Sequence, residues 1–457
     1  MNSSWRRREL ALLILYAIIF YAIIIRHSLR LSRDHHYKLY GLRAGWIANR
    51  LNDASDAQWR NFRGNLPILT IVLGIFTLVA NMLRAYFHLQ AMGMSVVWLL
   101  ISLTYLCYLH GAFILFVLAI ASVNFLLAKV RVVQENLGLF GQLQGYLPMA
   151  YLLQFWYTIC LFNFLRFMSV LLVYLSACCS VHDRLWMQLL NIAVVLRMIS
   201  FGYDYHWADR SSRIDQKERS VQNDKFSFVI YLCYLVYAPL YIAGPVISFN
   251  AFASQLDTPQ KNYSLREVAW YGLRWGFSLL LMELMTHFFY YNAFAISGLW
   301  KQLTPLDVFI IGYGVLNFMW LKFFLIWRYF RFWSLISGIE TPENMPRCIN
   351  NCHNLESFWK NWHASFNKWL VRYMYIPLGG SQTKLLNVWV VFTFVAIWHD
   401  LEWKLLSWAW LTCIFFIPEL IVKSAANAFQ VESTFGEFVF RELSAVAGAV
   451  TITCLMV

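Results

Sequence analysis

Long apolar runs dominate the pattern of hydrophobic and polar positions along this chain of 457 residues. A helix needs about 20 apolar residues, and at least roughly 17, to cross the hydrocarbon core of a bilayer. The pattern therefore predicts an all-α polytopic membrane protein with about 10–12 transmembrane or re-entrant helices. The clear runs begin near Leu10, Leu66, Val96, Ala112, Met149, Phe226, Gly272, Leu306, Leu405 and Glu442, and shorter ones occupy residues 186–200 and 385–398.

Composition and charge agree with a membrane protein. Charged residues make up 13% of the chain, about half of the share typical of soluble domains. The net charge of +13 does not indicate a nucleic-acid-binding protein, because the basic residues lie in short segments between apolar runs. We expect the bilayer and its anionic head groups as the partner of these residues, and no nucleic acid. Basic clusters on both sides of the first run leave the orientation of the N-terminus open.

One segment near the C-terminal third has a different pattern. From Asn354 to Ile376, aromatic residues recur at steps of three and four with cationic and amide residues between them, which predicts an amphipathic helix. Asn354 is a suitable N-cap, and Pro377 with Gly379-Gly380 ends the helix. An aromatic face with interspersed cations favours a position near the head groups or along a polar cavity.

Two histidines in this part of the chain are candidates for chemistry. His399 ends the apolar run of residues 388–398, and His363 lies within the amphipathic segment. Histidine titrates near neutrality, and an ionisable side chain at membrane depth is commonly functional. Both residues therefore suggest acid–base catalysis, although a packed histidine that is hydrogen-bonded to a neighbouring helix fits the same pattern.

Other reactive patterns are absent from the sequence. Cys348, Cys352 and His353 lie close together, but they do not have the spacing of a zinc site, and we expect no metal. No Gly-x-Ser-x-Gly motif indicates a serine nucleophile. The chemistry thus favours a nucleophile supplied by the substrate, such as an alcohol that loses its proton to histidine as it attacks a thioester.

The order of several motifs resembles the membrane-bound O-acyltransferase superfamily. These are Phe358–His363, the stretch Arg372–Ser381 (RYMYIPLGGS) and Ala396–Asp400 (AIWHD). Residues 237–245 (YAPLYIAGP) and 327–333 (WRYFRFW) are similar to the branch that holds the Gup proteins, named for glycerol uptake, and Hedgehog acyltransferase. The resemblance is strongest from about residue 226 to residue 419.

The resemblance implies a fold, a domain organisation and a reaction. It implies one membrane domain, 1–457, of tilted helices around a central tunnel, with N-terminal helices and loops in 1–225, a catalytic core in 226–424 and a C-terminal helix in 425–457. The implied reaction transfers a long fatty acyl chain from acyl-CoA to a hydroxyl of a lipid, most simply a lyso-form of a glycosylphosphatidylinositol (GPI) anchor or a lysophospholipid. The implied location is the endoplasmic reticulum membrane. Acyl-CoA is a co-substrate, and no cofactor is implied.

The resemblance also assigns roles to residues. His399 matches the main family histidine, and we expect it to be the general base. His363 matches the second catalytic position, which is aspartate in Hedgehog acyltransferase. Supporting residues are Trp362, Asn367, Trp398 and Asp400. The candidates for holding the acyl donor are Arg347, Lys360, Arg372, Tyr375, Gly379, Gly380 and Lys384, because cations and exposed backbone N–H groups bind phosphate.

Two other functions stay open at this point. Kinship with Hedgehog acyltransferase favours a protein acyltransferase or a regulator of one. The Gup name favours a glycerol/proton transporter, in which His399, Glu283 and His287 form a proton path. Glu283 and His287 are four residues apart on one helical face, so a structural ion pair fits them as well.

Overall fold

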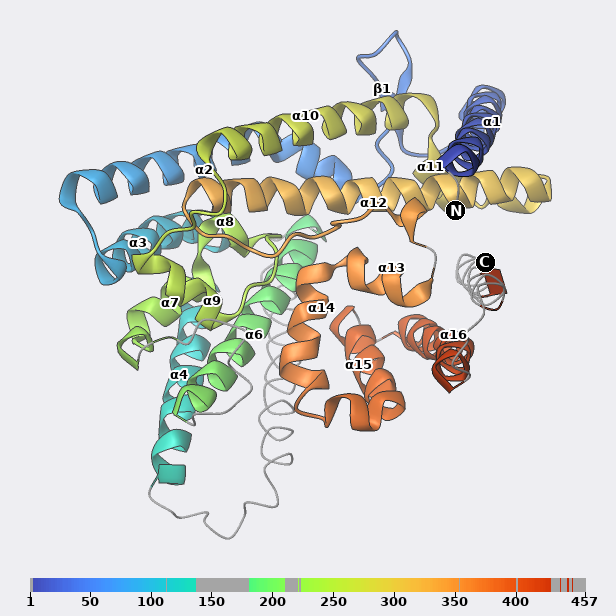
Figure 1. The fold of residues 1–457 in the computed structure, drawn as a ribbon. Coiled ribbons are helices and arrows are strands. Elements are labelled where there is room, and N and C mark those ends of the chain that lie inside the picture. Colours follow the sequence, from blue (N-terminus) through green and yellow to red (C-terminus); the bar gives the residue numbers. More distant parts are fainter. Residues whose placement is uncertain are drawn as a thin grey trace. The chain divides into compact units, whose positions relative to one another are not determined.

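The structure is a computed structural model and describes residues 3–111, 113–136, 181–209, 223–352, 354–399 and 402–428, with isolated positions at 221, 436, 442, 443 and 446. It is almost entirely helical, which confirms the all-α prediction. The run that begins near Met149, most of the C-terminal helix predicted in 425–457, His353 and Asp400 lie outside the described residues. Figure 1 shows the order of the elements.

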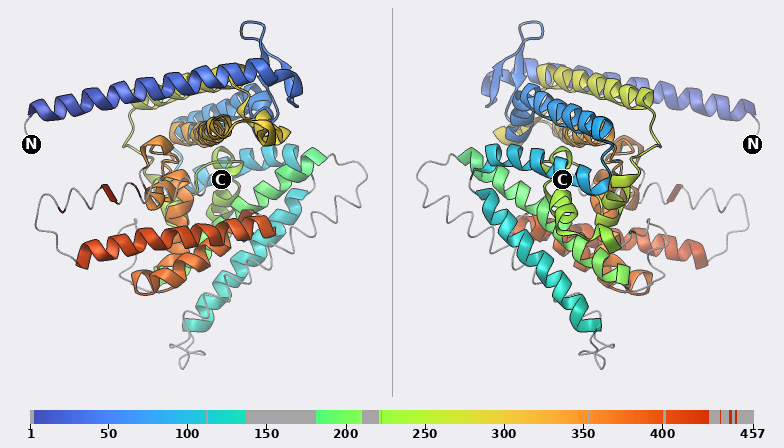
Figure 2. Two further views of the ribbon diagram at one scale, coloured as in Figure 1. Left: turned by 90° about the vertical axis from the view of Figure 1, so that its right-hand side faces the viewer. Right: turned by 90° about the vertical axis from the view of Figure 1, so that its left-hand side faces the viewer.

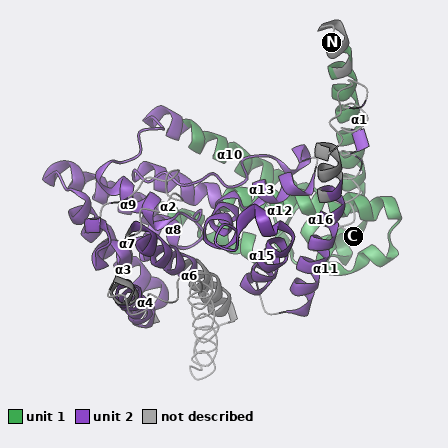
Figure 3. Cartoon of the chain, turned by 60° about the horizontal axis from the view of Figure 1, so that its bottom comes forward, with its two compact units in different colours: residues 1–70, 270–326, 456 green, residues 71–269, 327–455, 457 purple. Residues whose placement is uncertain are grey.

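The chain forms two compact units (Figure 3). Unit 1 contains residues 1–70, 270–326 and 456, and unit 2 contains residues 71–269, 327–455 and 457. Helices α2 (Ala57–Phe87), α10 (Leu265–Phe288) and α12 (Pro305–Ile336) each contribute residues to both units. The predicted divisions at residues 225 and 424 stay predictions.

Five described helices are long and apolar enough to cross a membrane, or six if one bent pair is a single span. The pair is α10 with α11 (Tyr291–Ser297), bent by 47°. The predicted 10–12 segments included shorter and re-entrant helices, and several of those are short or broken here. The five spans are Leu10–Lys38, Ala57–Phe87, Ala91–His110, Pro305–Ile336 and Gly380–His399.

Unit 1 begins with α1 (Ser3–His35) and the short helix η1 (His36–Lys38), followed by a hairpin that sequence analysis did not predict. Strands β1 (Leu42–Ala44) and β2 (Leu51–Asp53) pair antiparallel, with Leu42 opposite Asp53. The carboxylate of Asp53 accepts a hydrogen bond of 2.9 Å from the backbone N–H of Ala293 in α11. This bond fixes the hairpin on α11, ahead of η5 (Leu299–Gln302) and α12.

Unit 2 holds the candidate site. Its N-terminal part contains helices that pack together, among them α4 and α6, which lie side by side in Figure 2. The C-terminal part pairs α15 with α16. The elements are α3 (Ala91–His110), α4 (Phe113–Asn136), α6 (Val181–Asp209), η4 (Asn223–Lys225), α7 (Phe228–Val236), α8 (Ala238–Tyr241), α9 (Phe249–Asp257), η6 (Ile349–Asn351), α13 (Leu355–Trp362), α14 (Ala364–Leu370), the π-helical turn η7 (Val371–Tyr375), η8 (Gly380–Thr383), α15 (Lys384–His399) and α16 (Trp403–Ala428).

A buried arginine explains why the run that begins near Phe226 does not form one span. The run ends as α7 at Val236, and Pro239 lies near the start of α8. The guanidinium of Arg197, which is 3% exposed, donates hydrogen bonds of 2.8 Å to the carbonyl of Leu235 and 2.6 Å to that of Leu240. A break between helices at membrane depth is tolerated where protein groups satisfy the freed carbonyls, and Arg197 does this here.

Candidate functional site

His399 is the last residue of the apolar helix α15; the residue has exposed surface, and its imidazole lies between two indole rings. Its ring lies 4.7 Å from the ring of Trp398 and 6.4 Å from that of Trp408 in α16, as distances between ring centroids. Helices α15 and α16 pack against each other and position both aromatic rings. An accessible imidazole at the end of an apolar helix can exchange a proton with a substrate.

His363 lies in the single-residue break between α13 and α14, outside the candidate spans. Its backbone is not helical, with φ −124° and ψ 67°. The imidazole stacks on Trp327 of α12, with centroids 4.2 Å apart and an angle of 17° between the planes. Burial, followed in importance by the nearby His399, lowers the pKa of His363 to about 3. The imidazole is therefore neutral at physiological pH.

Trp398 contacts the rings of both histidines. Its ring centroid is 6.3 Å from that of His363, in addition to the 4.7 Å to His399. It stacks on Phe366 of α14 at 4.4 Å, and Phe366 in turn lies 5.3 Å from His363. The structure thus brings the two predicted histidines together around one indole, from helices that are distant in sequence.

The amphipathic segment is not the continuous helix that we predicted. Asn354 is the N-cap, since its side chain accepts a hydrogen bond of 2.7 Å from the backbone N–H of Ser357. The chain then breaks at His363, because the side-chain oxygen of Asn344 accepts a bond of 2.8 Å from the N–H of Ser365 in the first turn of α14. The Ser365 hydroxyl accepts a further bond of 2.9 Å from the backbone of Val246. Groups remote in sequence therefore stabilise an additional helix terminus.

The other supporting residues have different positions. Trp362 stacks on Phe358 at 5.4 Å within α13. For Asn367, the sequence allows a side-chain hydrogen bond to the His363 imidazole, although it favours a plain position on the helix surface. The bond that the structure shows instead joins backbones, from the N–H of Asn367 to the carbonyl of His363 at 2.9 Å.

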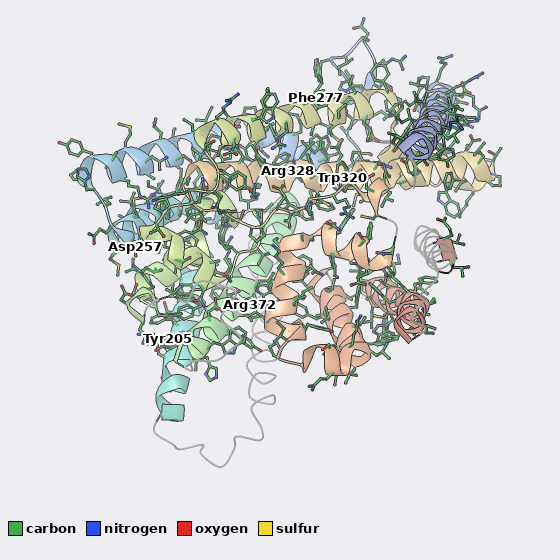
Figure 4. The ribbon with its side chains drawn as sticks, in the orientation of Figure 1. Tyr205, Asp257, Phe277, Trp320, Arg328 and Arg372 are labelled. Atoms are coloured by element: carbon green, nitrogen blue, oxygen red, sulfur yellow. The ribbon has the colours of Figure 1, made fainter. Side chains whose placement is uncertain are left out.

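Arg372 is already engaged by protein, which argues against a phosphate site at this residue. Its side chain is labelled in Figure 4, and the guanidinium is 3.0 Å from a carboxylate oxygen of Asp204, a fully buried residue of α6. The same oxygen accepts a bond of 3.0 Å from the Tyr373 hydroxyl, and the other accepts one of 2.9 Å from the N–H of Asn250. Sequence reasoning missed Asp204, because these partners lie on η7 and α9, both of them far from α6 in sequence.

The remaining candidates for holding the acyl donor are spread over the surface of the C-terminal part of unit 2. Lys360 forms an exposed ion pair of 2.6 Å with Glu356. Arg347 and Lys384 are exposed, and Tyr375 is partly buried. Gly379 and Gly380 have φ of +98° and +59°, values that favour glycine, so they form a tight turn as predicted.

Two arginines of the motif at 327–333 form a charged cluster with one glutamate. Arg328 and Arg331 of α12 both approach the carboxylate of Glu343, at 2.8 Å and 2.9 Å. Arg331 also donates a bond of 3.0 Å to the carbonyl of Thr341. These contacts fix the segment that carries Asn344. The two arginines come directly after Trp327 in α12, and Trp327 is the residue on which His363 stacks. The motif at 327–333 was visible in the sequence, but its partners were not.

The proton path of the transporter hypothesis involves two units. Glu283 and His287 belong to unit 1, and His399 belongs to unit 2. Glu283 pairs with Arg63 and accepts a bond of 2.9 Å from the Trp46 indole, while a ring nitrogen of His287 is 2.7 Å from the carbonyl of Glu283. These contacts are those of a structural cluster. Among the described residues, no group of three or more histidine, cysteine or acidic side chains is arranged to hold a metal ion.

Comparison with known proteins identifies the family. The profile of the membrane-bound O-acyltransferase family matches residues 151–457. The chain is 33% identical to membrane-bound O-acyltransferase gup1 of Schizosaccharomyces pombe over 406 residues, which covers 83% of this chain and 68% of that protein. It is 30% identical to membrane-bound O-acyltransferase GUP1 of Saccharomyces cerevisiae over 488 residues, or 100% of this chain and 83% of the relative.

A more distant similarity covers part of the chain. Protein-cysteine N-palmitoyltransferase HHAT of Mus musculus is 27% identical over 202 residues, which covers 42% of this chain and 40% of that protein. With the family profile and the Gup relatives, this places the chain in the branch that sequence analysis indicated. The chain belongs to the membrane-bound O-acyltransferase family, in its Gup and HHAT-like branch, and is an integral membrane O-acyltransferase.

Proposed function

We propose that this O-acyltransferase moves a long fatty acyl chain from acyl-CoA to a free hydroxyl of a lyso-GPI anchor or lysophospholipid in the endoplasmic reticulum membrane. The observation that carries the proposal is the approach of His399 and His363 to one indole ring, at 4.7 Å and 6.3 Å. The Gup resemblance supports the lipid acceptor and the membrane. No cofactor enters the reaction.

The proposed reaction uses the substrate's own nucleophile. His399 removes the proton of the acceptor hydroxyl as its oxygen attacks the thioester carbonyl, so that a carbon–oxygen bond forms and the carbonyl electrons move to oxygen. Collapse of this intermediate breaks the carbon–sulfur bond, and the thiolate of CoA takes the proton from His399. General-base catalysis of this kind is commonly worth about 100- to 10,000-fold in rate.

His363 acts as a neutral partner in this proposal. Its stacking on Trp327 at 4.2 Å holds the ring in place, and its lowered pKa keeps it uncharged. A neutral imidazole can both donate and accept a hydrogen bond, which suits the orientation of a hydroxyl or thioester. The segment between His363 and His399, which contains the Gly379-Gly380 turn, is the proposed region for the head of acyl-CoA.

A transfer assay tests the proposal. Purified protein in lipid nanodiscs is given labelled long-chain acyl-CoA with a lyso-GPI, a lysophospholipid or a peptide with an N-terminal cysteine. We expect label in the lipids, and a rate that falls about 1,000-fold in His399→Gln. The matched control is His110→Gln, which changes a histidine at the end of α3 and keeps the activity. Label in the peptide alone would instead support a protein acyltransferase.

A further inference from the structure

The indole N–H of Trp398 is a buried donor beside both histidines. Its Nε1 atom has almost no accessible surface, and it has no hydrogen-bond partner among the described residues. Buried polar groups are normally paired, because a donor that loses water without gaining an acceptor is costly. An unpaired donor next to His399 and His363 therefore needs an explanation.

Another indole of the same aromatic cluster, that of Trp369, has hydrogen-bond acceptors. Trp369 belongs to the same core cluster, and its Nε1 donates to the Ser200 hydroxyl at 2.8 Å and to the carbonyl of Leu196 at 3.2 Å. The ring of Trp398 is equally well held, since it stacks on Phe366 at 4.4 Å with an angle of 26°. Its donor is thus fixed in direction but has no acceptor in the described part of the chain.

Position distinguishes Trp398 from other tryptophans with an unpaired donor. Buried indole nitrogens without a partner among the described residues occur also in Trp98, Trp320, Trp333 and Trp359. No ring contact found in the described part of the chain joins any of these four directly to His363 or His399, and Trp359 reaches His399 only through Trp408. An unpaired N–H therefore does not indicate a role unless reacting groups are near it.

Acyl transfer creates a hydrogen-bond acceptor for the indole N–H of Trp398. When the acceptor hydroxyl attacks the thioester, the carbonyl oxygen gains negative charge, and a fixed N–H aimed at that oxygen stabilises the charge. Indole N–H only donates, so it supplies the hydrogen bond without losing its proton. We infer that Trp398 is the oxyanion donor of the reaction proposed above, on which this inference rests.

Access to this donor requires a side chain to move. The Nε1 atom is covered, whereas the neighbouring His399 is exposed at the end of α15. A thioester oxygen can therefore bind Nε1 only after a covering group shifts as substrate enters. Catalytic hydrogen bonds often form in this way, with their final geometry only in the substrate complex.

Three tryptophan-to-phenylalanine variants test the inference, because this change removes the N–H and keeps an aromatic ring. For Trp398→Phe we expect kcat to fall about 100-fold, KM for acyl-CoA to change by less than about 3-fold, and the melting temperature not to fall. Trp369→Phe removes the two buried hydrogen bonds that the indole donates to Ser200 and Leu196, so it lowers the melting temperature while kcat stays within about 3-fold. Trp98→Phe removes a remote unpaired donor and leaves kcat unchanged.

Two results would overturn the inference. One is a kcat within about 3-fold of the native protein in Trp398→Phe. The other is a loss of kcat in that variant together with the fall in melting temperature that Trp369→Phe shows, because both changes would then have a structural cause. His399→Gln measured in parallel separates the two proposals: if it keeps activity while Trp398→Phe loses it, the base assignment fails and the oxyanion donor stands.

Discussion

The two histidines differ in what surrounds the imidazole. His363 is stacked face to face on Trp327, which removes water from the ring and disfavours its charged form. His399 contacts two indole rings at larger angles and is exposed. In the proposed reaction the exposed imidazole gains and loses a proton, whereas the covered one keeps a single neutral form and orients the substrate.

The pH dependence of the reaction tests this difference. The pKa of His363 is lowered from 6.5 to about 3, so His363 stays neutral between about pH 5 and pH 8. We expect an acid limb of kcat in that range to have the same midpoint in the native protein and in His363→Asn, although kcat is lower in the variant. A midpoint that moves by more than about half a unit would contradict a neutral His363.

The same pKa sets the sign of an effect on stability. The unfolded chain binds a proton at His363 near pH 6.5, and the folded chain does so only near pH 3. The contribution of neutral His363 to folding is therefore complete above about pH 6.5 and is lost progressively as the pH falls towards 3. Thermal unfolding of His363→Asn should depend less steeply on pH in this window than that of the native protein.

At the scale of elements, the break at His363 gives the site its form. Local sequence predicted the start of α13 at the Asn354 cap and the turn at Gly379, since both depend on neighbouring residues. It could not predict the break, because the hydrogen bonds that stabilise it come from Asn344 and Val246. Periodicity describes one face of one helix, and it contains no information on a partner from another segment.

Loss of the Asn344 side chain should affect both stability and position. In Asn344→Ala the N–H of Ser365 loses its acceptor, and we expect a loss of about 1 kcal/mol in the free energy of unfolding. We also expect a lower kcat, since His363 is the residue that precedes this turn. Ser248→Ala is the matched control, because Ser248 caps α9 by accepting a bond from the N–H of Ala251. Denaturation and kcat are measured for both variants; an equal loss of kcat in the two would refute a positioning role for Asn344.

For the whole molecule, composition established the membrane class, whereas the number of spans depended on tertiary contacts. The run near Phe226 is long enough to span, but it is divided where Arg197 binds the carbonyls of Leu235 and Leu240. The run near Ala112 gives a shorter apolar helix, Ile114–Val130. The proximity of His363 and His399 likewise depends on the packing of α14 and α15 around Trp398, which no local pattern encodes.

For the whole molecule, a mutation in the cluster at Glu283 distinguishes the enzyme hypothesis from the transporter hypothesis. Glu283 is 6% exposed and binds Arg63 with two hydrogen bonds, one of them 2.8 Å long. We expect Glu283→Gln to lower the free energy of unfolding by about 1–2 kcal/mol, less than for a fully buried pair because Arg63 is partly exposed. Acyl transfer per folded molecule should not change, since this residue contributes nothing to the proposed reaction.

Proteoliposomes allow both activities to be measured on one preparation, with thermal unfolding as the third measurement. A transporter would use Glu283 and His287 to carry protons, so its glycerol flux would disappear in Glu283→Gln while the protein stayed folded. In an acyltransferase, His399→Gln stops transfer, and Glu283→Gln only reduces the amount of folded protein. The enzyme hypothesis makes His399 essential and Glu283 structural, whereas the transporter hypothesis makes Glu283 essential. A glycerol flux that is lost in Glu283→Gln at unchanged stability would therefore refute the structural role proposed for the cluster.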